Sequence, residues 1–147
     1  MKNLIVPTMS EFLGLDEEHA RAFAAAWLPA WSGNRPHDLI AFYTDDAYYS
    51  DPGVPAGLCG RDALLEYFVR LLAHNPNWRW THRGSVPIRD GFLNEWHASM
   101  PVGERSLELD GVCTVQLRGG LIYRNQVYFD RAPLLQAIER LRGVRSE

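Results

Sequence analysis

The sequence has few of the residues that build metal, redox or extracellular sites. Of its 147 residues only two are cysteines, Cys59 and Cys113, and they lie far apart. Their spacing matches no metal-binding or disulfide pattern, so we expect two reduced thiols in a cytoplasmic protein. There is also no H-x-H, H-E-x-x-H or Cys-x-x-Cys spacing. We therefore expect neither a metal ion nor another cofactor.

An excess of positive charge and long apolar segments are also missing. The net charge is -3 at pH 7, so nucleic acid and anionic membranes are not expected partners. No segment approaches the roughly 20 apolar residues of a membrane span, and the N-terminal apolar run ends at Pro7, too short for a signal peptide. Hydrophobic residues make up 46% of the chain. We expect one globular domain over residues 1–147, with 1–14 as a loosely ordered lead-in.

The first half of the chain predicts mostly helices. Asp16 can cap a helix whose apolar residues recur at helical spacing as far as Trp31. A short second helix is expected over residues 37–43 and a third over 60–73, whose buried stripe is Leu64, Leu65, Phe68 and Leu72. Between these two helices lies a strand, residues 47–50. It must stop at Pro52, because proline cannot donate to a sheet ladder.

The second half predicts long strands in sequence. Apolar and polar residues alternate over residues 78–88, 92–100, 106–117 and 121–129, with turn signals at Asp90-Gly91 and Gly119-Gly120. A closing helix is expected from Pro133 to Arg142. Helices followed by antiparallel strands indicate an α+β fold with helices on one face of the sheet. A single β-bulge would exchange the two faces of a strand.

Asp51 occupies the most informative position in the sequence. It stands at the end of the strand in FYTDDAYYSDPGVPAGLCGRDALLEYF (residues 42–68), beside the aromatic residues Tyr43, Tyr48 and Tyr49. A carboxylate at a strand mouth among aromatic rings is a candidate general base. An Asp before Pro-Gly can equally accept hydrogen bonds from the turn that follows it. The sequence leaves both interpretations open.

The run DDAYYSDP, followed by a Pro/Gly loop and by Gly60-Arg61 at a helix start, resembles the nuclear transport factor 2-like superfamily. Within it, the chain is most similar to the SnoaL-like group, which includes polyketide cyclases and is related to ketosteroid isomerase. Glu95-Trp96, Asp110-Gly111-Val112 and Tyr128-Phe129-Asp130 extend the match over residues 17–138. The resemblance implies a cone-like fold, with N-terminal helices on the concave face of a strongly curved, mostly antiparallel sheet. It also implies a blind pocket and a homodimer formed through the outer sheet face.

For function, the resemblance implies a cofactor-independent acid–base enzyme acting on a small hydrophobic carbonyl compound, as an isomerase, cyclase or hydratase/hydrolase. Asp51 matches the general base of ketosteroid isomerase. The two oxyanion donors of that enzyme do not carry over, because Trp27 and Cys113 stand at the matching positions and are weak donors. This counts against steroid-type isomerisation but not against other proton transfers. The alternative is a non-catalytic module of the same fold that binds a small ligand or a protein.

Each of the other candidate residues has a functional and a structural interpretation. His82, on an apolar strand face, is either a proton partner for Asp51 or a satisfied core histidine. Asp130 loosely matches the late acid/base Asp of SnoaL-like cyclases, or it supports the first turn of the closing helix. Several aromatic residues could line a pocket for a flat apolar ligand. These are Trp27, Trp31, Tyr49, Trp80, Trp96 and Tyr128. Cys113 would touch the same ligand.

Overall fold

The computed structural model of the protein describes residues 13–146. The first elements are helix α2 (Glu17–Trp27), the 3-10 turn η1 (Leu28–Trp31) and helix α3 (Pro36–Ile40). The side chain of Asp16 caps α2, where it accepts a hydrogen bond of 2.9 Å from the backbone N–H of His19. The predicted lead-in over residues 1–14 lies almost wholly outside the described residues.

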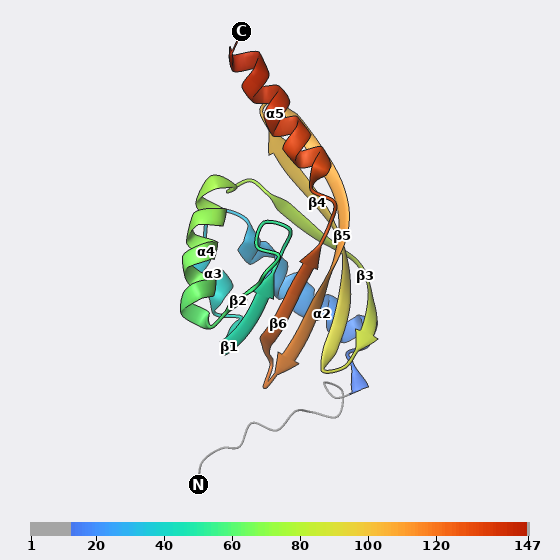
Figure 1. Ribbon diagram of the computed structural model, residues 1–147. Helices are drawn as coiled ribbons and strands as arrows, with labels where there is room; N and C mark the ends of the chain where they lie inside the picture. Colours follow the sequence, from blue (N-terminus) through green and yellow to red (C-terminus); the bar gives the residue numbers. More distant parts are fainter. Residues whose placement is uncertain (1–12, 147) are drawn as a thin grey trace.

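Within residues 13–146, six strands form one sheet in the order β2-β1-β6-β5-β4-β3. Their bounds are β1 Tyr43–Ser50, β2 Leu58–Cys59, β3 Arg79–Ile88, β4 Gly91–Val102, β5 Arg105–Arg118 and β6 Leu121–Tyr128. Neighbouring strands are antiparallel except β1 and β6, which run parallel. The sheet is therefore mixed but mostly antiparallel, as predicted, and it curves strongly around one face (Figure 1).

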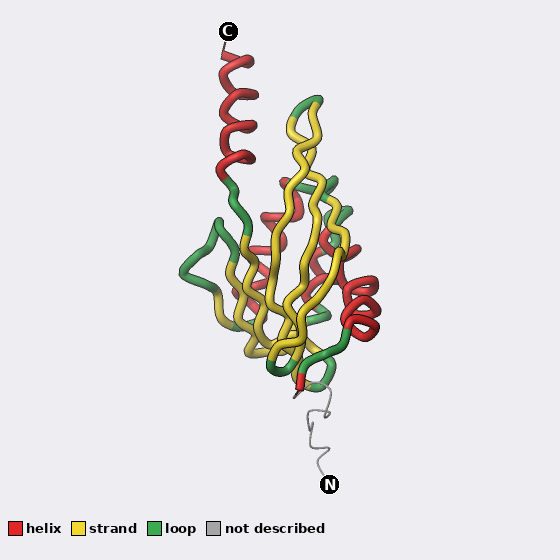
Figure 2. Tube along the Cα trace, turned by 90° about the vertical axis from the view of Figure 1, so that its right-hand side faces the viewer, coloured by secondary structure: helices red, strands yellow, loops and turns green. Residues whose placement is uncertain are grey.

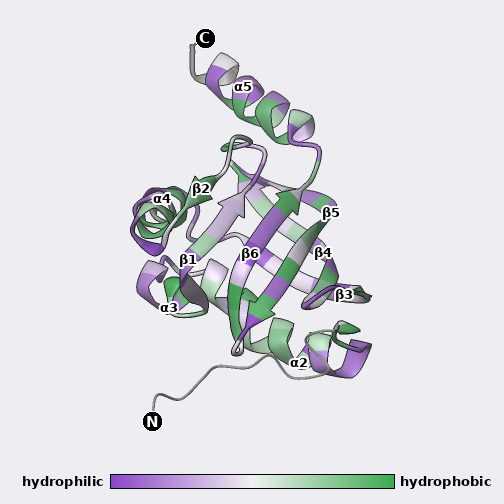
Figure 3. Cartoon of the chain, turned by 60° about the horizontal axis from the view of Figure 1, so that its bottom comes forward, coloured by the Kyte–Doolittle hydropathy of each residue, from purple (hydrophilic) through white to green (hydrophobic). Residues whose placement is uncertain are grey.

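Helices α2, α3 and α4 (Arg61–His74) cover the concave face of this sheet (Figures 1 and 2). The buried stripe of α4 is Leu64, Phe68 and Leu72, each fully inaccessible to solvent. Along β5 and β6 hydrophobic residues alternate with hydrophilic ones (Figure 3), so each strand buries one side against the helices. The predicted α+β cone-like fold is confirmed.

Helix α5 (Ala132–Ser146) extends beyond the end of the sheet (Figure 1). It touches the turn between β4 and β5, where a Cβ on Gly103 would lie 2.9 Å from Cδ1 of Leu141. Leu135, at the start of the helix, is 49% exposed. The closing helix was therefore predicted in the right place, but most of its length lies outside the main core.

Two local predictions were wrong. The helix expected over residues 37–43 ends at Ile40, and Tyr43 instead opens β1, where its buried hydroxyl donates to Asn125 Oδ1 at 2.9 Å. Tyr43 therefore does not stand beside Asp51. In β3 the register shifts between His82 and Gly84. This irregularity exchanges the two faces of the strand, so Val86, expected inside, is 49% exposed.

The outer face of the sheet carries charged groups. His97 lies 2.8 Å from Asp110 and 3.3 Å from Glu108 on this face. The homodimer expected through this face stays a prediction. Within residues 13–146, the structure has no helix long and apolar enough to cross a membrane.

Candidate active site

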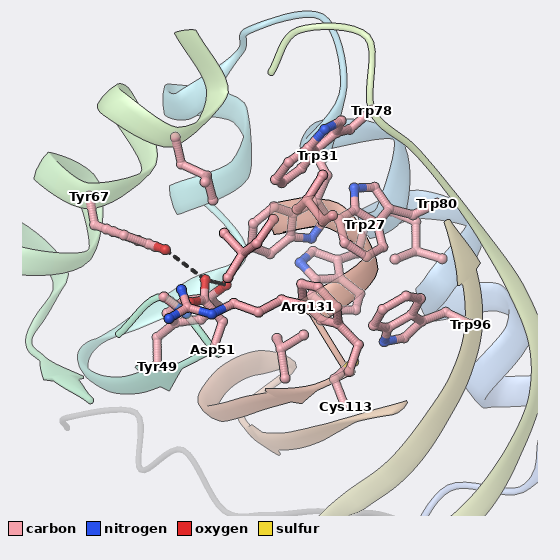
Figure 4. Close-up of a pocket in the computed structure, with 17 residues that line it drawn as sticks. Trp27, Trp31, Tyr49, Asp51, Tyr67, Trp78, Trp80, Trp96, Cys113 and Arg131 are labelled. Carbon is pink, nitrogen blue, oxygen red and sulfur yellow. Dashed lines mark hydrogen bonds between the residues drawn. The ribbon is translucent and has the colours of Figure 1, made fainter. Parts of the chain in front are cut away.

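A cavity of about 180 Å³ lies between the concave face of the sheet and the helices. All five tryptophans of the chain line it, from α2, η1, the connection before β3, β3 and β4 (Figure 4). We call this cavity the tryptophan pocket. Its lining residues are Trp27, Leu28, Trp31, Tyr49, Asp51, Gly53, Tyr67, Leu71, Trp78, Trp80, Trp96, Cys113, Val127, Phe129, Arg131, Leu134 and Leu135.

Asp51 is the one carboxylate among these lining residues, and it accepts four hydrogen bonds. Its Oδ2 accepts from the hydroxyls of Tyr49 and Tyr67, each at 2.8 Å. Its Oδ1 accepts from the backbone N–H groups of Gly53 at 2.7 Å and Val54 at 3.1 Å. The structural interpretation is confirmed, because Oδ1 caps the turn. The carboxylate also lines the pocket, and its role as a general base stays a prediction. Four donors occupy all the lone-pair sites of a carboxylate.

Neighbouring elements fix the two tyrosines. Tyr49 shares the inward side of β1 with Ala47 and is 2% exposed. Tyr67 precedes Phe68, which points into the core from α4, so its ring lies on the flank of the buried stripe and reaches Asp51 from the helix side (Figure 4). The Tyr49 and Tyr67 rings lie 5.9 Å apart and bracket the carboxylate.

Both phenols remain protonated. Burial and the charge of Asp51 raise the pKa of Tyr49 well above its ordinary value. The same two causes raise the pKa of Tyr67, and the positive charges of Arg131 and Arg70 partly oppose them. The site therefore holds one carboxylate and two neutral hydroxyl donors.

Arg131 brings a positive charge to the same corner. It lies between β6 and α5, and its side chain extends across the pocket mouth toward Asp51 (Figure 4). A Cβ placed on Gly53 would be 3.1 Å from Asp51 Oδ1, 3.3 Å from the Tyr67 hydroxyl and 3.9 Å from Arg131 Nη1. The absence of a side chain at Gly53 leaves a point on which three polar groups converge.

The rest of the pocket wall is aromatic. Trp80 and Trp96 pack edge to face with centroids 4.7 Å apart, and Phe129 packs on Trp96 at 5.7 Å. Among the described residues the indole N–H groups of Trp27 and Trp80 find no hydrogen-bond acceptor. The Trp27 indole lies close enough to the core hydroxyl of Tyr43 to affect its pKa, but without hydrogen-bond geometry.

Cys113 lines the pocket as an apolar group. It is 2% exposed, and burial raises the pKa of its thiol to about 12, so it carries no charge at neutral pH. Asn94 Nδ2 donates a weak hydrogen bond to its sulfur at 3.9 Å. Like Trp27, it supplies no strong donor.

Three predicted site residues lie elsewhere. His82 is outside the pocket lining, since its Nδ1 pairs with Asn94 Oδ1 at 2.5 Å and its Nε2 with Glu17 Oε1 at 2.8 Å. Both ring nitrogens are engaged, so His82 joins α2 to β3 and is no partner of Asp51. Asp130 accepts a hydrogen bond of 2.9 Å from the Ala132 N–H at the start of α5, which is the structural alternative.

Tyr128 also lies outside the pocket. It is 52% exposed on the opposite face of β6, and the next residue, Phe129, enters the pocket instead. The remaining predicted residues, Asp51, Trp27, Tyr49, Trp80, Trp96 and Cys113, do line one cavity.

Sequence reasoning missed the two polar residues that complete the site. Tyr67 was hidden because it sits beside the apolar stripe of α4 and gives no motif of its own. Arg131 was hidden because it belongs to a short connection between a strand and a helix. Within residues 13–146 no group of three or more His, Cys, Asp or Glu side chains could hold a metal ion.

Residues 24–125 match the family described as the SnoaL-like domain. The chain belongs to the SnoaL-like domain family. This SnoaL-like protein has no match among curated proteins. Its fold, however, is shared by several solved structures.

One similar structure is a hypothetical protein from Catenulispora acidiphila with a ketosteroid isomerase-like fold, in complex with trimethylamine. It has TM-score 0.69 and 21% identity, over 80% of this chain and 92% of that chain. A second is a putative SnoaL-like polyketide cyclase from Shewanella putrefaciens, with TM-score 0.71 and 11% identity over 95% and 98%. A third is TerC co-crystallised with polyporic acid, with TM-score 0.67 and 14% identity over 80% and 96%. At these identities the likeness shows the fold.

Proposed function

We propose that this SnoaL-like protein is a cofactor-independent proton-transfer enzyme acting on a small hydrophobic carbonyl compound. The observation that carries the proposal is the environment of Asp51. Among the described residues, it is the only carboxylate lining the tryptophan pocket, and two neutral phenols bind its Oδ2. A carboxylate and hydroxyl donors at the edge of an apolar cavity are the groups that proton abstraction next to a carbonyl requires.

Tyr67 would act as a switchable donor in this chemistry. With both phenols bound, Asp51 Oδ2 has no lone pair free to accept a proton. A ligand carbonyl at the convergence point near Gly53 would compete for the Tyr67 hydrogen, and rotation of that hydroxyl would release the lone pair on Oδ2. One movement would thus provide both the oxyanion donor and the base. Tyr67 is better placed for it than Tyr49, because Tyr49 is almost completely enclosed.

The proposed step moves one proton and one electron pair. The C–H bond next to the carbonyl breaks, its proton goes to Asp51 Oδ2, and its electrons form an enolate whose oxygen accepts the Tyr67 hydrogen bond. Return of the proton to a different carbon gives isomerisation. Attack of the enolate carbon on a second carbonyl of the same molecule gives aldol-type cyclisation, and the alkoxide that forms takes the proton back from Asp51. The aromatic wall excludes water, which strengthens these electrostatic interactions.

The structural neighbours are compatible with a small ligand, since two of them were solved with trimethylamine and with polyporic acid. The second candidate function, a non-catalytic ligand-binding module, is favoured by the same four hydrogen bonds to Asp51, because they also describe a stable turn cap. The two functions differ in one measurable property, which is whether the protein exchanges a carbon-bound proton.

The test is deuterium exchange, followed by NMR in heavy water, for a panel of cyclic enones and β-dicarbonyl compounds. We expect exchange with the wild type, a loss of roughly 100-fold or more in Asp51→Asn, and a smaller loss in Tyr67→Phe. Asp130→Asn is the matched control, because it removes a nearby carboxylate that lies outside the pocket, and it should exchange at the wild-type rate. Exchange that persists in Asp51→Asn would rule out Asp51 as the base. If no compound in the panel exchanges but ligands still raise the melting temperature, the non-catalytic ligand-binding module would be the function that remains.

A further inference from the structure

The mouth of the tryptophan pocket holds a positive charge without a protein partner. Arg131 is the only cationic side chain among the described residues that line the pocket. Within residues 13–146 its guanidinium forms no hydrogen bond and no ion pair, although it is near Asp51. The neighbouring Arg70, by contrast, lies 3.7 Å from Glu66. An arginine that lines a cavity with its donors free is available to a ligand.

The electrostatic influence of Arg131 reaches the proposed reaction point. It acts on the Tyr67 hydroxyl, where it favours the negatively charged form of the phenol. A negative oxygen placed beside that hydroxyl would feel the same attraction. The negative charge of Asp51 would repel such an oxygen less than its position suggests, because four hydrogen-bond donors already surround the carboxylate.

We propose that the ligand of the tryptophan pocket carries an anionic oxygen group, either a carboxylate or an ionised enol, that binds Arg131 at the mouth. This inference rests on the proposed function, since it concerns the ligand of the same pocket. The planar guanidinium matches two oxygens of such a group in a forked arrangement. The five tryptophans and Phe129 would hold the apolar body of the ligand.

The charges of Arg131 and Asp51 also indicate which ligands should bind poorly. An alkylammonium group could approach Asp51 only where Arg131 repels it and where both oxygens of the carboxylate already have donors. A neutral compound would fill the aromatic wall and leave the guanidinium without a partner. The preferred order is therefore anion, then neutral molecule, then cation.

Three naphthalenes of nearly equal shape test this order: 2-naphthoate, 2-naphthamide and 2-(aminomethyl)naphthalene in its ammonium form. Dissociation constants would be measured by titration calorimetry or NMR at low salt for the wild type and Arg131→Gln. We expect 2-naphthoate to bind the wild type roughly tenfold more tightly than 2-naphthamide. This preference should disappear in Arg131→Gln, persist in part in Arg131→Lys, and shrink at 1 M salt.

The matched control is Arg79→Gln, which removes the same charge from an exposed position in β3 outside the pocket lining. It should keep the preference for 2-naphthoate, and 2-naphthamide should bind all variants equally. The proposal is overturned if the ammonium compound binds best, if the preference survives in Arg131→Gln, or if none of the three compounds binds. Because Asp51-dependent exchange can be read with the cyclic enones of the panel, which are neutral, it can succeed while this ligand preference fails, and the reverse also holds.

Discussion

Gly111 allows Trp96 to form the wall of the tryptophan pocket, so Gly111→Ala should disturb both stability and binding. The two residues are partners across β4 and β5. A Cβ on Gly111 would lie 2.3 Å from Cζ2 and 2.4 Å from Cη2 of Trp96, and 2.8 Å from the backbone oxygen of Tyr128. No carbon atom can be accommodated at these distances, so the indole must move. Trp80 and Phe129 block two directions, and the pocket is the open one.

The magnitude follows from overpacking. Forcing an extra methyl group into a closely packed site costs about 1–3 kcal/mol, while the reduced entropy of the unfolded Ala chain offsets less than about 1 kcal/mol. Gly111 has no left-handed backbone conformation, so backbone strain adds nothing. We expect a net loss of about 1–2 kcal/mol in the free energy of unfolding, or several degrees in melting temperature for a chain of this size.

Urea denaturation and thermal unfolding would measure this loss, with 2-naphthamide binding as the second readout. Gly143→Ala in α5 is the matched control, since its Cβ would meet no atom within 4 Å, and it should keep or slightly raise stability through helix propensity. Combining Gly111→Ala with Trp96→Phe should cost less than the sum of the two single changes, because the smaller ring relieves the clash. Wild-type stability of Gly111→Ala, or simple additivity in the double variant, would refute the reasoning.

Two further predictions concern side chains outside the proposed chemistry. Hydrogen bonds from Ser85 and His82 lower the pKa of Glu17 from 4.5 to about 2, so their stabilisation is complete above pH 4.5 and lost as the pH falls toward 2. Urea unfolding of wild type and Glu17→Gln across this range should show a steeper pH dependence in the wild type, and equal slopes would contradict the assignment. Burial raises the pKa of Cys113 to about 12 whereas Cys59 is exposed, so a thiol reagent at pH 8 should label one cysteine in the native protein and both in urea. Rapid labelling of both in the native state would show that Cys113 is accessible.

The fold was largely predictable because its signals are local. Alternation of apolar and polar residues placed β3 to β6 within about two residues of their observed ends, and the Asp16 cap fixed the start of α2. The first strand was placed less well, since β1 begins four residues before the predicted start, and the two-residue β2 was not predicted. The bulge in β3 had one local sign, Gly84 inside the strand pattern, which is typical of a bulge but does not require one. Only the pairing with β4 shows the shift. One such shift placed Val86 on the wrong face.

The site was predictable only in part. Asp51 stood out because Pro52 ends its strand, and the tryptophans stood out by composition. The contacts that define its chemistry are between distant parts of the chain, as when Tyr67 of α4 reaches a carboxylate at the end of β1. Helical spacing places Tyr67 beside the buried stripe, but it does not say what the hydroxyl meets. His82 failed for the same reason, because its partner Glu17 is 65 residues away.

The parallel pairing of β1 with β6 has a consequence for how the protein folds. Asp51 ends an early strand, yet the strand next to it in the sheet comes near the end of the described chain, and the contact between Tyr43 and Asn125 spans 82 residues. Closing a loop of this length costs entropy before any contact repays it. During synthesis α4 and the β1–β2 pair can form early, but the other side of β1 has no partner strand until β6 has left the ribosome. The part of the pocket lined by Val127, Phe129 and Arg131 then forms last. The pocket can therefore bind a ligand only after β6 has paired with β1.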